Sequence, residues 1–200
     1  MKSIHRKIWN LALPYQDKRD DKGHAKTVVS FAIKLLKTEK ADPDVVIPAA
    51  ILHDIGWSRL SKKERFSIFK PEPAETGKTF SGDIEIRKKH QDEGVKIARR
   101  ILSKTKYNKT LVSEILEIIS EHDTRIGFIS KNEGVMRDAD KLWRFSRTGF
   151  LADSRRRNMP HLENLRRLKQ KTRMHGFFYS KTAKKIAAEE LKKRKKEFKL

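Results

Sequence analysis

Apolar residues along this chain recur at the spacing of one face of an α-helix. Between His24 and Leu35, they follow the histidine at four, seven and eleven positions, which predicts a helix over about 24–40. The chain has no convincing alternation of apolar and polar residues and no Asn-Gly hairpin signal, so we expect no strands. The pattern predicts an all-α fold.

The same periodicity, combined with signals for helix ends, predicts six further helices. Asp42 and Pro43 are typical of an N-cap and a first helical position, so we expect a helix from there through Leu52. Gly56 should end this helix, and Pro48 implies a kink within it or a later start. The other helices are expected over about 83–103, 108–123, 133–146, 160–174 and 180–198.

Residues 57–82 lack this periodicity and contain two prolines and two glycines, Pro71, Pro73, Gly77 and Gly82. We therefore expect a long loop there, and loops of that length usually act as lids or binding loops. A length of 200 residues suits one domain. We expect a single unit over 1–200, with a core at about 20–146 and a basic helical extension at about 151–200.

Composition excludes several classes of protein. The chain has no cysteine, which excludes thiol catalysis, cysteine-bound zinc, iron–sulfur clusters and a disulfide scaffold. No apolar run approaches the roughly 18 residues of a membrane span. Asn10 and Pro14 interrupt the apolar stretch near the start, so we do not expect a signal peptide there. We expect a soluble, cytoplasmic protein that does not contact a membrane.

The chain is strongly basic, and the excess charge is concentrated towards its end. Lysine and arginine number 48 against 26 aspartate and glutamate, for a net charge of +22. Residues 151–200 hold 17 basic and 5 acidic residues, including the run Lys192–Lys196. A positive surface attracts anions such as nucleotides or nucleic acid. The run is equally typical of a solvated helix face, so nucleic-acid binding by this tail stays open.

Several histidines and aspartates stand where the pattern calls for apolar residues. A single histidine at the edge of a core usually bonds a backbone carbonyl, but buried imidazoles and carboxylates are costly unless paired or ligated. Their number favours a shared metal ion at the centre of the helices, and mixed nitrogen and oxygen donors suit Mn, Fe, Co, Ni, Zn or Mg. The residues are His24, His53, Asp54, His90, His122 and Asp140.

The spacing of four of these residues resembles a known signature. His24, the doublet His53-Asp54 in AAILHDIG, and Asp140 in RDADKLWRF are similar to the His…His-Asp…Asp pattern of the HD-domain phosphohydrolases. The resemblance covers about 20–146 and implies a compact helical bundle of the HD-domain type. It also implies that these four residues bind one divalent metal ion.

Two intermediate segments and the tail extend the resemblance. KKHQDEGVKIARRIL and IISEHDTR are similar to family segments that carry additional histidines, here His90 and His122. In some members such histidines bind a second metal, and in others they contact the substrate phosphate. Many members have a second histidine where this chain has Asp123, which leaves a second metal open. The tail SKTAKKIAAEELKKRKKEF loosely resembles the last helix of small bacterial and archaeal HD hydrolases.

The resemblance implies a metal-dependent phosphohydrolase of nucleotides or related phosphate esters, in which a metal-activated water attacks phosphorus. Asp54, His90 and His122 are then the candidate catalytic residues. Lys141 follows Asp140 where the family usually has a basic residue, and it is a candidate phosphate contact together with Arg59 and Lys62.

Some roles in this reading stay open. Trp57 and Phe66 are candidates either to stack a base or to pack in the core. Asp138 is expected to support the metal ligands or to face solvent. The alternatives to the phosphohydrolase are a nucleic-acid-binding protein or nuclease, a non-catalytic metal-binding regulatory module, and an oxygenase. The metal and the oligomeric state stay open.

Overall fold

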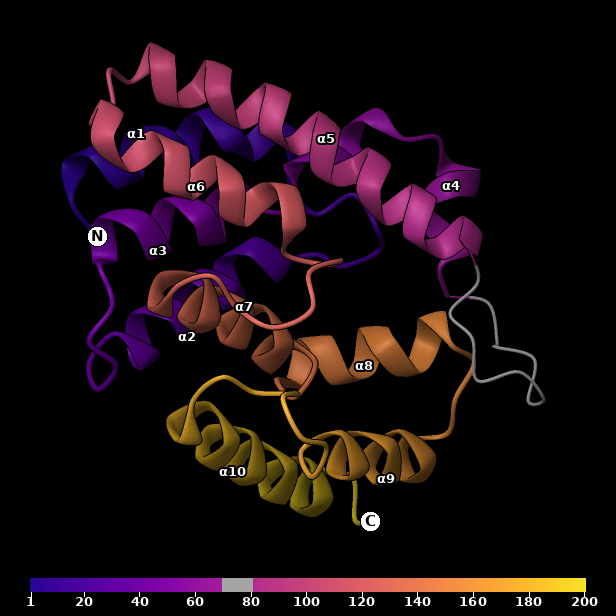
Figure 1. The fold of residues 1–200 in the computed structure, drawn as a ribbon. Helices are drawn as coiled ribbons and strands as arrows, with labels where there is room; N and C mark the ends of the chain where they lie inside the picture. Colours follow the sequence, from indigo (N-terminus) through magenta and orange to yellow (C-terminus); the bar gives the residue numbers. More distant parts are fainter. Residues whose placement is uncertain (70–80) are drawn as a thin grey trace.

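The computed structural model describes residues 1–69 and 81–200, and this part of the chain contains ten α-helices, two 3₁₀ helices and no strand. The predicted all-α fold is confirmed. In order, the elements are α1 (Ser3–Ala12), η1 (Leu13–Tyr15), α2 (His24–Leu35), α3 (Pro43–Leu52), η2 (Ile55–Arg59), α4 (Lys62–Ser67), α5 (Ser81–Lys104), α6 (Lys109–Glu121), α7 (Lys131–Trp143), α8 (Arg147–Arg156), α9 (His161–Lys171) and α10 (Lys181–Glu197) (Figure 1).

Helix α3 lies at the centre of the fold and packs against α1, α2, α6 and α7. Every residue from Val45 to Leu52 is buried, as expected for a helix enclosed by other helices. The side chain of Asp42 accepts a hydrogen bond from the Asp44 N–H at 2.8 Å. The predicted N-cap is therefore confirmed.

Pro48 lies inside α3, where proline lacks the N–H that would bond the carbonyl four residues earlier. That carbonyl belongs to Asp44, and the hydroxyl of Tyr107 donates a hydrogen bond to it at 2.6 Å. A side chain from the turn between α5 and α6 therefore satisfies the acceptor that proline leaves free. The helix begins at Pro43, so the expectation of a later start is wrong.

Gly56 does not end α3, contrary to our expectation. The helix ends at Leu52 with His53 as its C-cap, and Gly56 lies within η2 without a positive φ angle. A Cβ on Gly56 would lie 1.8 Å from the carbonyl oxygen of His90. The glycine is required because η2 runs directly against α5.

Part of the predicted long loop is helical. Residues 57–69 complete η2 and form α4, which begins with a reciprocal capping box between Ser61 and Glu64. Gly82 lies inside α5. The rest of the predicted loop, 70–80, lies outside the described residues. No helix in the described ranges combines the length and the apolar character that a membrane crossing needs.

The C-terminal helices pack onto the rest of the chain. Helices α5 and α6 lie side by side at one side of the molecule, and α8, α9 and α10 lie at the other, with α2, α3 and α7 between them (Figure 1). Leu168, Ile186 and Leu191 belong to the same buried cluster as the apolar residues of α3. The basic tail therefore shares the central core. Helices α1, α4 and α8 were not predicted from the sequence.

Asp138 joins the tail to α7. Its carboxylate is buried and accepts hydrogen bonds from the backbone N–H groups of Tyr179 and Ser180, both at 2.8 Å. The hydroxyl of Ser180 donates to the same carboxylate and accepts from the Ala183 N–H, which caps α10. The expectation that Asp138 faces solvent or supports the ligands is wrong, because this residue holds the start of α10.

Candidate metal centre

Four residues form the first half of the site, and Asp54 is the one that precedes η2 as its N-cap. His24 is the first residue of α2, His53 caps the end of α3, and Asp140 lies in the last turn of α7. The Nε2 atoms of His24 and His53 are 3.1 Å apart. Asp140 Oδ1 lies 3.5 Å from each of them, and Asp54 Oδ2 lies 3.3 Å from His24 Nε2 and 3.7 Å from His53 Nε2.

The second half of the site uses the other oxygen of Asp54. Asp54 Oδ1 lies 3.6 Å from His90 Nε2 on α5 and 3.4 Å from His122 Nε2 at the end of α6. The two Nε2 atoms are 3.4 Å apart. Asp123 Oδ2 is 3.9 Å from His90 Nε2 and forms an ion pair with Arg87 at 2.8 Å. Asp54 thus presents one oxygen to each pair of histidines.

The donor set fits a divalent metal ion. Two groups could hold one: His24, His53 and Asp54, and Asp54, His90 and His122. Nδ1 of His53 lies 3.0 Å from the Ala50 carbonyl, and Nδ1 of His122 lies 2.9 Å from the Ile119 carbonyl. A proton on Nδ1 leaves Nε2 free to bind a metal, which is the usual arrangement of ligating histidines.

The electrostatics of the site favour a bound cation. Burial would raise the pKa of Asp54, but Arg19 and His53 outweigh burial and hold that pKa well below its usual value. Burial opposes charge on His53, yet Asp54 and Asp140 raise its pKa to about 9. The carboxylates therefore attract positive charge strongly, and a divalent ion held by this donor set would supply it.

His90 differs from His53 in its charge state. Burial and the nearby His122 lower the pKa of His90 to about 3. The imidazole of His90 is therefore neutral near pH 7, which is the form that binds a metal or accepts a hydrogen bond.

Arg19 is a site residue that sequence reasoning missed. Its Nη2 donates to Asp54 Oδ2, its Nε lies 3.5 Å from Asp21 Oδ2, and its guanidinium lies 4.3 Å from the ring centroid of Trp57. In the sequence, Arg19 stands in the polar turn QDKRDDKG. It has no pattern that separates it from an ordinary turn cation facing solvent.

The three predicted phosphate contacts lie elsewhere. Lys141 Nζ donates to the Phe177 carbonyl, and burial lowers its pKa to about 8. Arg59 is exposed, with its guanidinium 5.8 Å from the ring centroid of Tyr15, and Lys62 is exposed at the start of α4. The structure does not bring these three together with the histidines and aspartates.

The two aromatic candidates are also accounted for by packing. Trp57 is 1% exposed, and its ring stacks on His90. Phe66 packs at an angle against Phe69. Trp57 in particular has no open face on which a base could stack.

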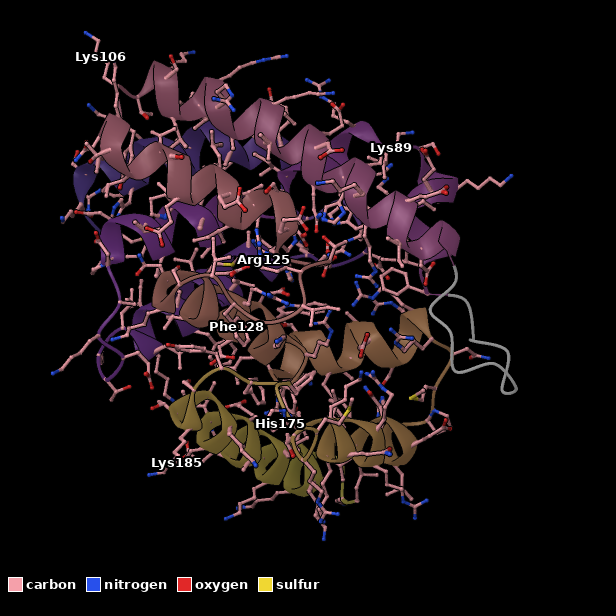
Figure 2. All side chains as sticks on the ribbon, in the orientation of Figure 1. Lys89, Lys106, Arg125, Phe128, His175 and Lys185 are labelled. Carbon is pink, nitrogen blue, oxygen red and sulfur yellow. The ribbon has the colours of Figure 1, made fainter. Side chains whose placement is uncertain are left out.

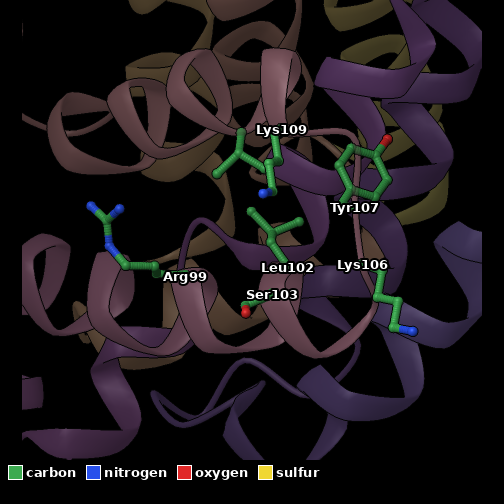
Figure 3. Close-up of a pocket in the computed structure, with 7 residues that line it drawn as sticks. Arg99, Leu102, Ser103, Lys106, Tyr107 and Lys109 are labelled. Atoms are coloured by element: carbon green, nitrogen blue, oxygen red, sulfur yellow. The ribbon is translucent and has the colours of Figure 1, made fainter.

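A small cavity of about 10 Å³ reaches the first half of the site and is lined in part by His24, His53 and Asp54. That volume is roughly the room one water needs. A larger cavity of about 530 Å³ lies where α5 ends and α6 begins, and it contains none of the predicted site residues (Figure 3). It is lined by Arg99, Leu102, Ser103, Lys106, Tyr107, Lys109 and Val112.

Comparison with known proteins decides the family. The family model of the HD domain matches residues 22–144, which include all six predicted histidines and aspartates. The chain belongs to the HD-domain family. Among solved structures, this HD domain is similar to the crystal structure of a predicted HD superfamily hydrolase from an uncultured Thermotogales bacterium, with a TM-score of 0.60 and 22% identity. The match covers 97% of this chain and 88% of the other. A search of curated proteins found no significant match.

Proposed function

We propose that this HD domain is a metal-dependent phosphohydrolase that acts on nucleotides or related phosphate esters. The observation that carries the proposal is the placement of Asp54, whose two oxygens face two separate pairs of buried histidines. A bound divalent ion supplies a nucleophilic water at neutral pH and polarises the phosphoryl oxygen. His24, His53, Asp54 and Asp140 are the residues that would hold it.

The remaining residues of the site have distinct roles in this proposal. The imidazoles of His90 and His122 either hold a second ion with Asp54 or bind the phosphate. Arg19 places a guanidinium beside Asp54, where it stabilises the negative charge that develops on the phosphoryl oxygens. Trp57 orients His90 by stacking on it. The nucleotide preference is an expectation from the family resemblance.

A screen of metals against substrates tests the proposal. Purified protein is loaded with Mn, Co, Ni, Mg, Fe or Zn and assayed on nucleoside mono-, di- and triphosphates and on oligonucleotides. We expect phosphate or pyrophosphate release with at least one metal, and loss of this activity in Asp140→Asn. Asp92→Asn, an exposed aspartate on α5, is the matched control and should keep activity. Activity that survives in Asp140→Asn would contradict the proposal.

A second candidate function, nucleic-acid binding by the tail, is favoured by four exposed lysines in the basic run near the end of α10. These are Lys192, Lys193, Lys195 and Lys196. Arg194, in the middle of the same run, is buried and pairs with Glu197 at 3.1 Å, so it does not belong to this surface. Figure 2 shows the exposed Lys106 near the top of the view and the exposed Lys185 near the bottom, so positive charge is not confined to the end of α10.

Neutralising the four lysines tests this second candidate. If the tail binds a polymer, the slope of log affinity against log salt concentration should flatten by roughly 0.7–0.9 for each lost phosphate contact. Oligonucleotide affinity that is unchanged by the substitutions would exclude it.

A further inference from the structure

A group of arginines surrounds one buried carboxylate next to the metal centre. Asp153 on α8 is 1% exposed. Arg167 Nη2 donates to its Oδ2, and Arg156 and Arg157 approach its Oδ1 at 3.5 Å and 3.4 Å. Arg156 at the end of α8, its C-cap Arg157, and Arg167 on α9 therefore share one carboxylate.

Arg144 connects this group to the metal centre. Its Nη1 lies 3.8 Å from Oδ2 of Asp140, the candidate metal ligand one helical turn earlier. Arg156 lies 4.9 Å from the ring centroid of Trp143, and that ring meets the imidazole of His24 edge-on at 4.8 Å. Arg144 thus contacts a candidate metal ligand directly, whereas the ring of Trp143 lies between Arg156 and His24.

The charge in this group is not balanced among the described residues. Arg156, Arg157 and Arg167 share Asp153, and Arg144 pairs with Asp140 of the candidate metal centre. Asp21 also acts on Arg156, but it is shared with Arg19, so these arginines still outnumber the carboxylates beside them. The side chain of Arg156 is only 4% exposed, and its Nε has no hydrogen-bond partner in the described ranges. Burial and the nearby Arg19 lower the pKa of Arg156 to about 10. Buried cations in excess of their anions are costly, so this arrangement calls for an added anion.

The group is open to a ligand. The side chains of Arg144 and Arg157 are 31% and 30% exposed. A guanidinium presents two parallel donors that match two phosphate oxygens, so arginine is suited to bind a phosphate group.

We propose that Arg144, Arg156 and Arg157 bind a second phosphate group of the substrate, while the first is hydrolysed at the metal centre. This inference rests on the proposed phosphohydrolase function. It narrows the substrate to phosphate esters with two or more phosphates. The second group either continues the reacting phosphate, as in a nucleoside diphosphate, or stands elsewhere on the molecule, as in a nucleoside 3′,5′-bisphosphate.

The kinetic experiment compares substrates with one and two phosphates. The ratio of kcat/KM for a nucleoside diphosphate, or for a 3′,5′-bisphosphate, to that for the monophosphate is measured in the metal-loaded protein. We expect Arg157→Gln to lower one of these ratios about tenfold or more, the usual loss for a charge-assisted contact. The matched control is Arg166→Gln on α9, which removes the same charge from an exposed arginine and should leave both ratios unchanged. Ratios that fall equally in the two variants would overturn the site, because net charge would explain them.

A binding experiment separates this inference from the proposed function. Inorganic pyrophosphate is titrated calorimetrically into metal-free protein from which the chelator has been dialysed. Wild type and Arg166→Gln should bind it, and Arg157→Gln should bind at least tenfold more weakly. Arg157→Lys, which keeps the charge and loses the paired donors, should fall between them if Arg157→Gln proves unstable. Absence of pyrophosphate binding in wild type would overturn the site even if hydrolysis is found. Arg157-dependent binding without any hydrolysis would support the anion site and reject the phosphohydrolase.

Discussion

The indole of Trp57 stacks on the imidazole of His90, with ring centroids 3.9 Å apart and planes inclined by 12°. The same indole donates its Nε1–H to Asp54 Oδ1 at 3.1 Å and lies against the guanidinium of Arg19. One buried side chain therefore orients three residues of the site. Its position two residues before the end of η2 explains why η2 must lie tightly against α5.

Replacing Trp57 should affect both stability and activity. Trp57→Leu removes the stacked ring and leaves a cavity, so the free energy of unfolding should fall by about 3 kcal/mol. Trp57→Phe keeps an aromatic ring on His90 and loses only the N–H, so it should fold well and turn over more slowly. Urea unfolding and kcat measure the two effects. Trp9 is a partly buried tryptophan of α1 and serves as the control. If Trp9→Leu lowers the free energy of unfolding as much as Trp57→Leu, the contacts of Trp57 do not contribute more to stability than those of an ordinary partly buried tryptophan.

Gly56 should tolerate no side chain. Gly56→Ala places a Cβ 1.8 Å from the His90 carbonyl oxygen and 2.4 Å from the Gly94 nitrogen, both backbone atoms that cannot rotate away. We expect a loss of more than about 2 kcal/mol in the free energy of unfolding. Gly94→Ala is the matched control, because its nearest contact is a side-chain methyl at 3.4 Å. That variant should change stability by no more than about 1 kcal/mol. Similar melting temperatures for the two variants would contradict this prediction.

Metal binding should stabilise the fold, because its ligands come together only on folding. At a free metal concentration about 100 times Kd, the gain is about 2.7 kcal/mol, which corresponds to a melting temperature higher by roughly 5–10 °C. His53→Ala should abolish this gain, whereas His122→Ala should keep one bound metal. Thermal melts with and without chelator, together with elemental analysis, check the prediction. Loss of all metal in His122→Ala would place that histidine among the ligands of the first ion.

Arg19 should matter more to catalysis than Arg59. Arg19→Gln removes the guanidinium beside Asp54 and should lower kcat/KM at least tenfold, or about 1.4 kcal/mol in transition-state stabilisation. Metal content should be retained, because Asp54 loses a competing cation. Arg59→Gln changes the same charge at an exposed position and should have little effect. A larger loss of kcat/KM in Arg59→Gln than in Arg19→Gln would support Arg59 as the phosphate contact, as predicted from the sequence.

The buried His5 should make stability depend on pH. Burial lowers its pKa below the ordinary value of 6.5, with Lys2 and the N-terminal amine in the same direction and Asp44 opposing them. Tyr107 also faces the ring, 3.5 Å from Nε2. Since the unfolded chain then binds the proton more readily, stability is fully present above about pH 6.5 and is lost as pH falls towards the folded pKa.

The difference between wild type and His5→Gln isolates this effect. Urea unfolding at pH 7.5 and pH 5.5 should show wild type losing stability relative to the variant at the lower pH. His175→Gln, at an exposed position, should follow wild type at both values. A constant difference between wild type and His5→Gln across this range would contradict the prediction.

Short-range signals account for the helices that were predicted correctly. The Asp-Pro start of α3 and the apolar faces of α2, α5, α6 and α7 act within one or two helical turns, so they are readable along the chain. Helix α8 was missed because it is rich in charge, with Asp153 and three arginines near its end. Asp153 forms an ion pair with Arg167 of α9, and no local sequence pattern predicts such a long-range contact.

By itself, the sequence determined the all-α class and the six histidines and aspartates that meet at one place, because buried polar residues in register with apolar faces must share a partner. It could not place Arg19, Arg144 or Arg156, since an arginine in a polar turn looks the same whether it faces solvent or a buried carboxylate. Nor could it show that Lys141 turns towards Phe177. Those outcomes depend on which helices pack together and on the buried charges they bring within a few ångströms of one another. Only the tertiary structure decides that.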